Sequence, residues 1–410
     1  MIRLSKARTA TGIAVTWVAV VLWLTLRDDP TARAAADATA WWCLACGDAG
    51  IADQFQNLLL LLPLGAALAV AGWPFRRAAI TATLLPLLIE LAQATLTVGR
   101  DATLGDVVAN AAGGCIGWWL GSRLRRRGSR AISASRGLPL IGVGLFVAQL
   151  LATASLVRPW PDGPAPWRLR LNPEVADRPT YRGDIVRVAL GGSQIVVESP
   201  RPAQPPDPDA PVLRAVFGWE AAPGAVLTPI LRLDDGRGWD IASVDRRGDF
   251  IGLSARTLGG RLRWRTPVWL LPVANATSTG DTITATLSFH RGEVIAVVAT
   301  TQSEQMLALR YGAQHGWTLV NPFTPFHDSA THWQWWTTAW LFGWGVLIGA
   351  ACGGVKRQWV WCGALLASLS AVCWWGGART TPAECIALAS GWWLAVLLSR
   401  TSARWAPDAA

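Results

Sequence analysis

The strongest constraint on the fold is a series of apolar stretches, each about twenty residues long. A helix of roughly 20 residues rises about 30 Å, which matches the hydrocarbon core of a bilayer. We therefore predict a mainly α-helical multi-pass membrane protein with about eight transmembrane helices. The predicted spans lie near residues 10–26, 54–73, 78–97, 103–121, 138–157, 334–353, 358–375 and 380–399.

Composition and charge agree with a membrane protein. The chain is 51% hydrophobic and only 16% charged, and it carries 26 Trp residues. Its net charge of +10 comes from short basic clusters beside the apolar stretches, with no basic groove interleaved with aromatic residues. Membrane lipids are therefore expected partners, and nucleic acid is not.

The basic clusters also predict the topology. If every stretch crosses the bilayer once, they fall on one side, which the positive-inside rule assigns to the cytoplasm. Both termini are then cytoplasmic, and the long region 158–333 lies outside the cytoplasm. Arg100, Arg158 and Arg379 are exceptions on the outer side. The basic clusters are the N-terminal residues, Arg76 with Arg77, residues 123–130, Lys356 with Arg357, and Arg400 with Arg404.

Region 159–330 differs from the rest because short β-rich runs alternate with turn residues, which predicts an all-β, antiparallel sandwich. Two tight hairpins are expected at Gly248 and Gly292. The runs Pro229 to Asp240, Phe250 to Arg256 and Ser288 to Val298 resemble a laminin G or concanavalin A-like jelly roll, and this resemblance implies binding of carbohydrate or protein. The predicted strands are 185–190, 194–198, 212–219, 227–233, 240–244, 250–255, 262–269, 282–289, 294–300 and 306–311.

Acidic residues in this β region are candidates for calcium ligands, and Trp239 or Trp264 is a candidate for stacking on a sugar. We favour the simpler interpretation that the acidic residues are solvated turn formers. No metal site and no cofactor are predicted, because no metal-ligand spacing and no nucleotide-binding motif is present. The acidic residues are Asp234, Asp235, Asp240, Asp245 and Asp249.

Polar side chains inside the apolar stretches predict a functional site, because ionisable groups at membrane depth are costly. Glu90 and Gln93 are three residues apart and share a helix face, as do Asp106 and Asn110 at a spacing of four. By position along their helices these residues fall in the outer half of the bilayer. We predict a polar pocket open to the outer side, formed by Asn57, Glu90, Gln93, Arg100, Asp101, Asp106 and Asn110.

The order of several motifs over residues 40–122 resembles the VanZ-like family, which is named for a teicoplanin-resistance protein. They are Cys43 to Cys46, Asp53 to Gly65, Glu90 to Gln93 and Gly99 to Gly117. The resemblance implies a bacterial cell-envelope protein in the cytoplasmic membrane, without implying a biochemical activity. The expected domains are a VanZ-like core of four helices at 1–130, a fifth helix at 131–158, the β-sandwich at 159–330, and three helices at 331–410.

Three roles remain open for the polar pocket. It can bind or modify an envelope glycan or lipid-linked precursor, with Glu90, Arg100 and Asp106 as candidate catalytic residues. It can form part of a transport or proton pathway in a small transporter. It can also be a structural network that fixes helix packing. A further alternative is a membrane-anchored binding module whose helices are a non-catalytic scaffold. The sequence predicts no oligomeric state.

Cys43 and Cys46 are spaced as a Cys-x-x-Cys pair on the predicted outer side. A disulfide and a metal site are both compatible with that spacing in an oxidising compartment. We favour a disulfide, because no second Cys-x-x-Cys accompanies the pair.

Overall fold

The computed structural model describes most of the chain, and it divides into two compact units, Met1–Ser135 and Arg136–Ala410. The described residues are 2–26, 41–45, 49–96, 102–133, 137–159, 166–174, 179–196, 198–199, 212–220, 227–236, 240–273, 280–290, 292–320, 330–352 and 358–404.

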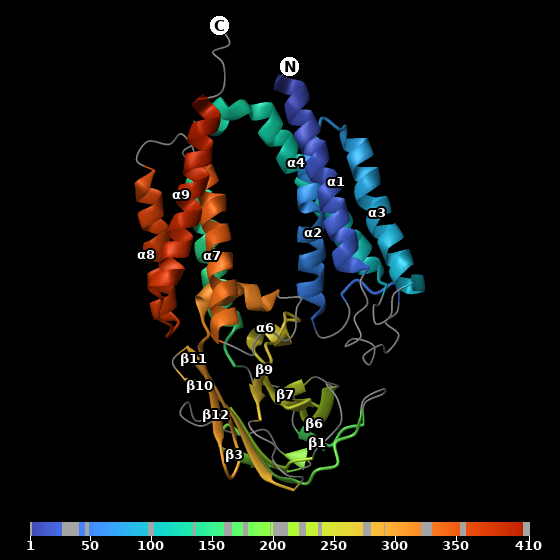
Figure 1. Ribbon diagram of the computed structural model, residues 1–410, viewed down its shortest axis with the longest axis vertical. Coiled ribbons are helices and arrows are strands. Elements are labelled where there is room, and N and C mark those ends of the chain that lie inside the picture. Colours follow the sequence, from blue (N-terminus) through green and yellow to red (C-terminus); the bar gives the residue numbers. More distant parts are fainter. Residues whose placement is uncertain are drawn as a thin grey trace. The chain divides into compact units, whose positions relative to one another are not determined.

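The first unit is built from four helices (Figure 1). Helix α2 packs against α1, α3 and α4, while α1 also touches α3 and α3 also touches α4. Aliphatic side chains fill the space between them, including Val21, Leu61, Leu64 and Ile89. The helices are α1 (Ile2–Thr25), α2 (Gly50–Val70), α3 (Phe75–Leu96) and α4 (Leu104–Ser133).

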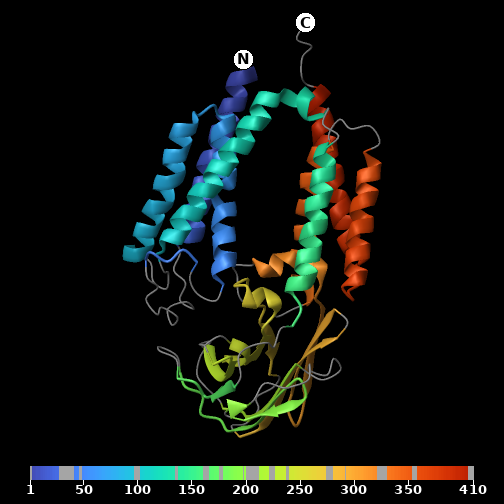
Figure 2. The ribbon, with the colours of Figure 1, turned by 180° about the vertical axis from the view of Figure 1, so that it is seen from behind.

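The second unit combines four long helices with a β domain, which is inserted between the first and second of these helices (Figure 2). Phe146, Leu150, Leu341 and Leu369 form the core between the helices. Every apolar stretch predicted from the sequence is therefore helical. The helices are α5 (Gly137–Leu156), α7 (Ala330–Ala351), α8 (Trp359–Trp375) and α9 (Pro382–Arg404).

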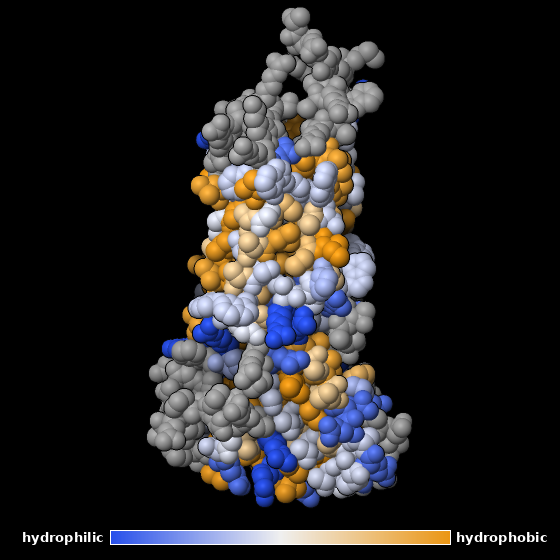
Figure 3. Space-filling model, turned by 90° about the vertical axis from the view of Figure 1, so that its left-hand side faces the viewer, coloured by the Kyte–Doolittle hydropathy of each residue, from blue (hydrophilic) through white to orange (hydrophobic). Residues whose placement is uncertain are grey.

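Four helical segments in the described part of the chain are long and apolar enough to cross a membrane: Ala7–Thr25, Gly50–Val70, Phe75–Leu96 and Pro139–Leu156. Trp359–Trp375 and Pro382–Leu398 are apolar but shorter. Large apolar side chains such as Leu88, Leu91 and Leu140 stand exposed on these helices, and Figure 3 shows an apolar band on the helical part of one face. The protein is therefore a membrane protein, while the full count of about eight crossings stays a prediction.

The β domain contains two antiparallel sheets of six strands each, in the orders β4-β1-β6-β7-β8-β9 and β12-β11-β10-β5-β2-β3. Side chains from both sheets share one core, with Phe217, Leu233, Val244 and Trp269 fully or almost fully buried. The β content is confirmed, and the jelly-roll assignment stays a prediction. The strands are β1 (Trp167–Leu171), β2 (Ile185–Leu190), β3 (Ser193–Ile195), β4 (Glu198–Ser199), β5 (Leu213–Gly218), β6 (Leu227–Asp234), β7 (Asp240–Arg247), β8 (Phe250–Ala255), β9 (Trp269–Pro272), β10 (Thr282–His290), β11 (Glu293–Ala299) and β12 (Glu304–Arg310).

Most predicted strands are present, with one clear error. Residues 262–269 do not form a strand, because they follow the short helix α6 (Leu258–Arg261) and Arg263 adopts a left-handed backbone with φ 62°. The strand β9 begins only at Trp269. Both hairpins form where expected, and Gly248 and Gly292 supply the positive φ that each turn requires.

The core of the β domain extends into the flanking helices. Val157 at the end of α5 and Trp333 in α7 belong to the same buried cluster as the strands. The indole of Trp333 donates to the carbonyl of Arg310 at 3.0 Å, and Trp317 donates to the hydroxyl of Thr337 at 3.1 Å. Trp317 belongs to η1 (Ala313–Leu319), a 3-10 helix that packs against α5, α7 and α8. The β domain is therefore packed onto its helices.

Acid is expected to destabilise this junction through His315, whose side chain is buried between Tyr311 and Trp333. Its Nδ1 accepts a hydrogen bond from the Gly312 N–H at 3.0 Å. Burial, with a smaller contribution from the positive charge of Arg310, lowers the pKa of His315 to about 3. The unfolded chain binds the proton near pH 6.5, so the stability is complete above that pH and is lost as the pH falls toward 3.

The full loss that corresponds to such a shift is roughly 5 kcal/mol, and about 3 kcal/mol of it is expected between pH 7 and pH 4. Thermal unfolding of the full chain, followed by tryptophan fluorescence between pH 7 and pH 4, measures it. His315→Asn keeps an acceptor near the Nδ1 position but cannot be protonated, so its unfolding temperature should fall less over the same range. Equal acid sensitivity of the two proteins would contradict the assignment.

Candidate functional site

Glycine residues bring α2 and α4 into close contact and so position the polar residues of the first unit. A Cβ at Gly113 would meet the carbonyl oxygen of Leu58, and a Cβ at Gly117 would meet that of Leu62. Because the contacts advance along both helices in the same direction, the two helices run parallel. Small residues allow this approach of backbones. The α2 residue Asn57 is thereby held beside the first turns of α4.

Asp106 is the centre of the polar cluster. Its Oδ1 accepts hydrogen bonds from the Asn57 side-chain amide at 2.5 Å and from the Gln54 amide at 3.3 Å. The Asp106 N–H donates to the hydroxyl of Thr103, the residue that precedes α4, at 3.2 Å. Asp106 itself is only half-buried. Two amide donors thus orient a carboxylate at the beginning of a helix, where the helix dipole also favours negative charge.

Glu90 has a different environment. It is buried on α3, and its Oε2 accepts a hydrogen bond from the Thr103 N–H at 2.9 Å. In a capping box an acidic residue of the helix itself accepts from the N-cap N–H. Here a carboxylate from a neighbouring helix provides this acceptor for α4. This geometry indicates that Glu90 fixes the start of α4 and thereby positions Asp106.

Asn110 lies one turn beyond Asp106. Its side-chain amide donates to the carbonyl of Asp106 at 2.9 Å. Its Oδ1 is buried and has no hydrogen-bond partner among the described residues. A buried acceptor without a donor costs free energy unless another molecule satisfies it. The start of α4 therefore has an acceptor in Glu90, while the side chain of Asn110 leaves one hydrogen-bond acceptor unused among the described residues.

The remaining predicted residues are not all in this cluster. The amide of Gln93 donates to the Thr25 carbonyl of α1 at 2.9 Å, so Gln93 ties α3 to α1. Arg100 and Asp101 lie outside the described residues. The structure adds Thr103 and Gln54. The Thr-x-x-Asp spacing of a helix start would have revealed Thr103, and Gln54 shares a helix face with Asn57 at a spacing of three.

Cys43 lies beside the same end of α4. The carbonyl of Cys43 accepts from the Gly105 N–H at 3.1 Å, and that of Trp41 accepts from the Leu104 N–H at 2.7 Å. Cys43 is disulfide-bonded. Cys46 lies outside the described residues, so their pairing stays a prediction. Among the described residues, no group of three His, Cys, Asp or Glu side chains is placed to hold a metal ion.

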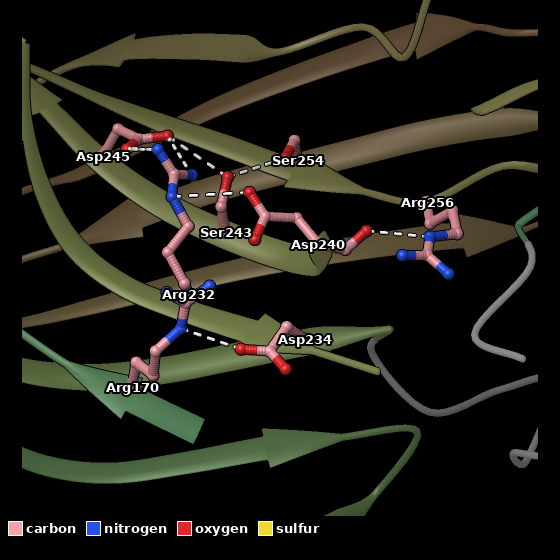
Figure 4. Close-up of polar contacts among 8 residues, drawn as sticks. All are labelled: Arg170, Arg232, Asp234, Asp240, Ser243, Asp245, Ser254 and Arg256. Carbon is pink, nitrogen blue, oxygen red and sulfur yellow. Dashed lines mark hydrogen bonds and ion pairs between the residues drawn. The ribbon is translucent and has the colours of Figure 1, made fainter. Parts of the chain in front are cut away.

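Asp249 is exposed in the turn between β7 and β8, as the sequence suggested, but other acidic residues of the β domain are not solvated turn formers. Asp245 is buried and receives two hydrogen bonds from Arg232, at 3.0 and 2.6 Å (Figure 4). Asp234 pairs with Arg170 at 2.8 Å, and Asp235 pairs with Arg256 at 3.3 Å. Trp264 packs against the core, while Trp239 lies outside the described residues. These carboxylates have arginine partners, so the calcium interpretation finds no support in the described geometry.

The fold and this cluster define a membrane protein whose first unit holds a polar group of side chains between its helices. Residues 12–125, which span that unit, match the VanZ/LLP1 family model, so this part of the chain is VanZ-like. No curated protein matches the chain, and neither does any solved structure.

Proposed function

We propose that the protein acts in the bacterial cell envelope, where the Asp106 cluster binds the polar part of an envelope glycan or lipid-linked substrate and thereby changes susceptibility to glycopeptide antibiotics. The observation that carries this proposal is that the half-buried Asp106 carboxylate lies on the same face of α4 as the buried, unsatisfied Oδ1 of Asn110. Both oxygens are hydrogen-bond acceptors on one helix face. A hydroxyl or N–H group of a sugar or peptide supplies matching donors.

The VanZ-like character of residues 12–125 supports the envelope role. In the proposed topology both termini are cytoplasmic, and the start of α4 faces the outer side together with the β domain. Arg123 and Arg125 then lie at the cytoplasmic end of α4, as the positive-inside rule requires. Within this proposal Asp106 accepts from the ligand, and Glu90 is a positioning residue.

Asp106→Asn is expected to abolish the effect of the protein on teicoplanin susceptibility. The substitution keeps the size of the side chain but removes the charge, and charge-assisted hydrogen bonds contribute about 1.5–3 kcal/mol, or roughly ten- to a hundredfold in affinity. The measurement is the inhibitory concentration of teicoplanin for cells that produce the full chain, with membrane abundance measured by immunoblot. Glu90→Gln is the matched control, because glutamine still offers an oxygen to the Thr103 N–H.

A binding measurement separates recognition from an indirect effect. Purified full-length protein in detergent is mixed with a polyprenyl diphosphate-linked disaccharide, and native mass spectrometry follows the complex. Wild type and Glu90→Gln should bind the probe, and Asp106→Asn should not. An unchanged phenotype of Asp106→Asn at normal abundance would refute the proposed function.

A further inference from the structure

The four helices of the second unit repeat the arrangement of the first. In the first unit, α1 contacts α2 and α3, and α4 contacts the same two helices. In the second unit, α5 contacts α7 and α8, and α9 contacts the same two helices. The order along the chain is the same in both units, with the β domain inserted into the connection that corresponds to the one between α1 and α2.

The close contacts between the parallel helices repeat in register. A Cβ at Gly113 would meet the carbonyl of Leu58, and a Cβ at Gly391 would meet that of Phe342. Another glycine stands seven residues after Leu58 and after Phe342, and these two glycines make equivalent contacts. A Cβ at Gly65 would meet the carbonyl of Gly114, the residue after Gly113. A Cβ at Gly349 would meet the carbonyl of Trp392, the residue after Gly391.

The helix starts repeat as well. The Thr103 hydroxyl accepts from the Asp106 N–H at 3.2 Å, and the Thr381 hydroxyl accepts from the Glu384 N–H, also at 3.2 Å. The spacing Thr-x-x-acid-x-x-Ala-x-Ala-x-Gly is identical in 103–113 and 381–391. Sequence spacing and three-dimensional contacts thus give the same alignment, in which Glu384 corresponds to Asp106.

The polar partners of Asp106 have no counterparts in the second unit. In this alignment Leu341 corresponds to Asn57, and Leu388 corresponds to Asn110. Both leucines are fully buried in the core of the helices. The amide donor and the unsatisfied amide oxygen of the first unit have therefore been replaced by apolar packing.

Residues of the β domain surround Glu384 instead. Gln314 of η1 lies close to its carboxylate and accepts a hydrogen bond from Cys373 at 3.2 Å. Arg310, at the end of β12, donates to the Arg379 carbonyl in the turn before α9 at 3.2 Å. Gly292 and Gly312 both pack against Ala378 in the same turn, so closely that a Cβ on either would overlap it.

We propose that α5, α7, α8 and α9 are a second copy of the four-helix unit, and that this copy uses the Glu384 position to hold its own β domain. The carboxylate, which in the first copy faces an external ligand, here faces Gln314 and Arg310. The contrast with an external ligand rests on the proposed function of the Asp106 cluster. The duplication rests on matching contacts in the two units, and the attachment role of Glu384 rests only on the contacts of the second unit.

Hydrogen exchange of the purified full chain tests the attachment role. Glu384→Gln keeps an acceptor for the Thr381 N–H, which now binds the carboxylate at 2.8 Å, and removes only the charge near Arg310. Exchange over η1 and β12 should become roughly tenfold faster, as expected for the loss of one charge-assisted interaction. Glu304→Gln removes an exposed charge from the same strand and should leave exchange unchanged.

Gln314→Leu is the second variant and should accelerate exchange over the same residues. Teicoplanin susceptibility should stay at the wild-type value in Glu384→Gln. If hydrogen exchange over η1 stays at the wild-type rate in both Glu384→Gln and Gln314→Leu, the proposal is overturned. It is also overturned if Glu384→Gln loses the effect on teicoplanin susceptibility while its exchange rate is unchanged. If Asp106→Asn leaves teicoplanin susceptibility unchanged, only the proposed function is refuted, because the exchange result for Glu384→Gln does not depend on the role of Asp106.

Discussion

Gly113→Ala is expected to destabilise the first unit by about 3 kcal/mol or more, because a packed backbone cannot accommodate an added methyl group. The new Cβ would overlap the Leu58 carbonyl, and this atom belongs to a helix backbone and cannot rotate away. The helices must then separate, which also pulls Asn57 away from Asp106. The unfolding temperature in detergent and the abundance of the protein in the membrane should both fall.

Gly12→Ala is the matched control for this prediction. It lies in α1 of the same unit, and a Cβ there would have no atom within 4 Å. Alanine has a higher helix propensity than glycine, so the control should be as stable as wild type or slightly more stable. Gly391→Ala should behave like Gly113→Ala, because it faces the Phe342 carbonyl in the same way. Equal stability of Gly113→Ala and Gly12→Ala would show that the two helices do not approach as described.

Asp245→Ala is expected to destabilise the β domain by about 3–5 kcal/mol, since it leaves a buried arginine without its main partner. The side chain of Arg232 is 16% exposed and that of Asp245 is 7% exposed, so water compensates little. Asp240, 3.5 Å from the Arg232 Nε, still compensates part of the charge of Arg232, so we expect a loss toward the lower end of this range. Urea unfolding followed by tryptophan fluorescence measures the change.

The double variant Arg232→Met with Asp245→Leu removes both charges and keeps much of the packing volume. It should lose clearly less stability than the sum of the two single variants, because neither charge remains buried alone. Asp249→Ala, at an exposed position of the neighbouring hairpin, should change the free energy of unfolding by less than about 1 kcal/mol. Additive effects of Arg232→Met and Asp245→Leu would show that the pair is not coupled.

The sequence predicted the helices well because apolar length is a local property. It also brought Asp106 and Asn110 onto one helix face through their spacing of four. It did not reveal that Asn57 and Gln54 donate to the same carboxylate oxygen, since this depends on how closely α2 and α4 approach. The glycines permit that approach, but the register of one helix against the other is set only by packing.

In the β domain the errors have local causes. Residues 262–265 alternate apolar and basic residues as a strand does, yet the left-handed Arg263 interrupts the extended backbone. Strand β1 shows the same alternation in Trp167–Leu171 and is not among the strands predicted from the sequence. The burial of Asp245 could not be predicted, because Arg232 reaches it from a neighbouring strand and cross-strand pairing is not encoded in local composition.

The duplication was not predicted from the sequence, because the two copies differ at the polar residues that are most noticeable in the apolar stretches. The amides Asn57 and Asn110 have become leucines, and an all-β domain separates the first helix of the second copy from the other three. What has been kept is a sparse pattern of glycines and one threonine with an acidic residue. These residues are constrained by backbone contact and helix capping, and the carbonyl that each glycine faces shows that the matching sequence spacing reflects matching contacts.

The shared core of the β domain and α7 has a consequence for biosynthesis. Trp333 is part of the buried cluster of the strands, but it is translated after all of them. The β domain therefore cannot complete its core until the first turn of α7 has been synthesised. Its folding depends on the helix that follows it in the chain, and a chain that ends before α7 would present an unfinished domain to proteases.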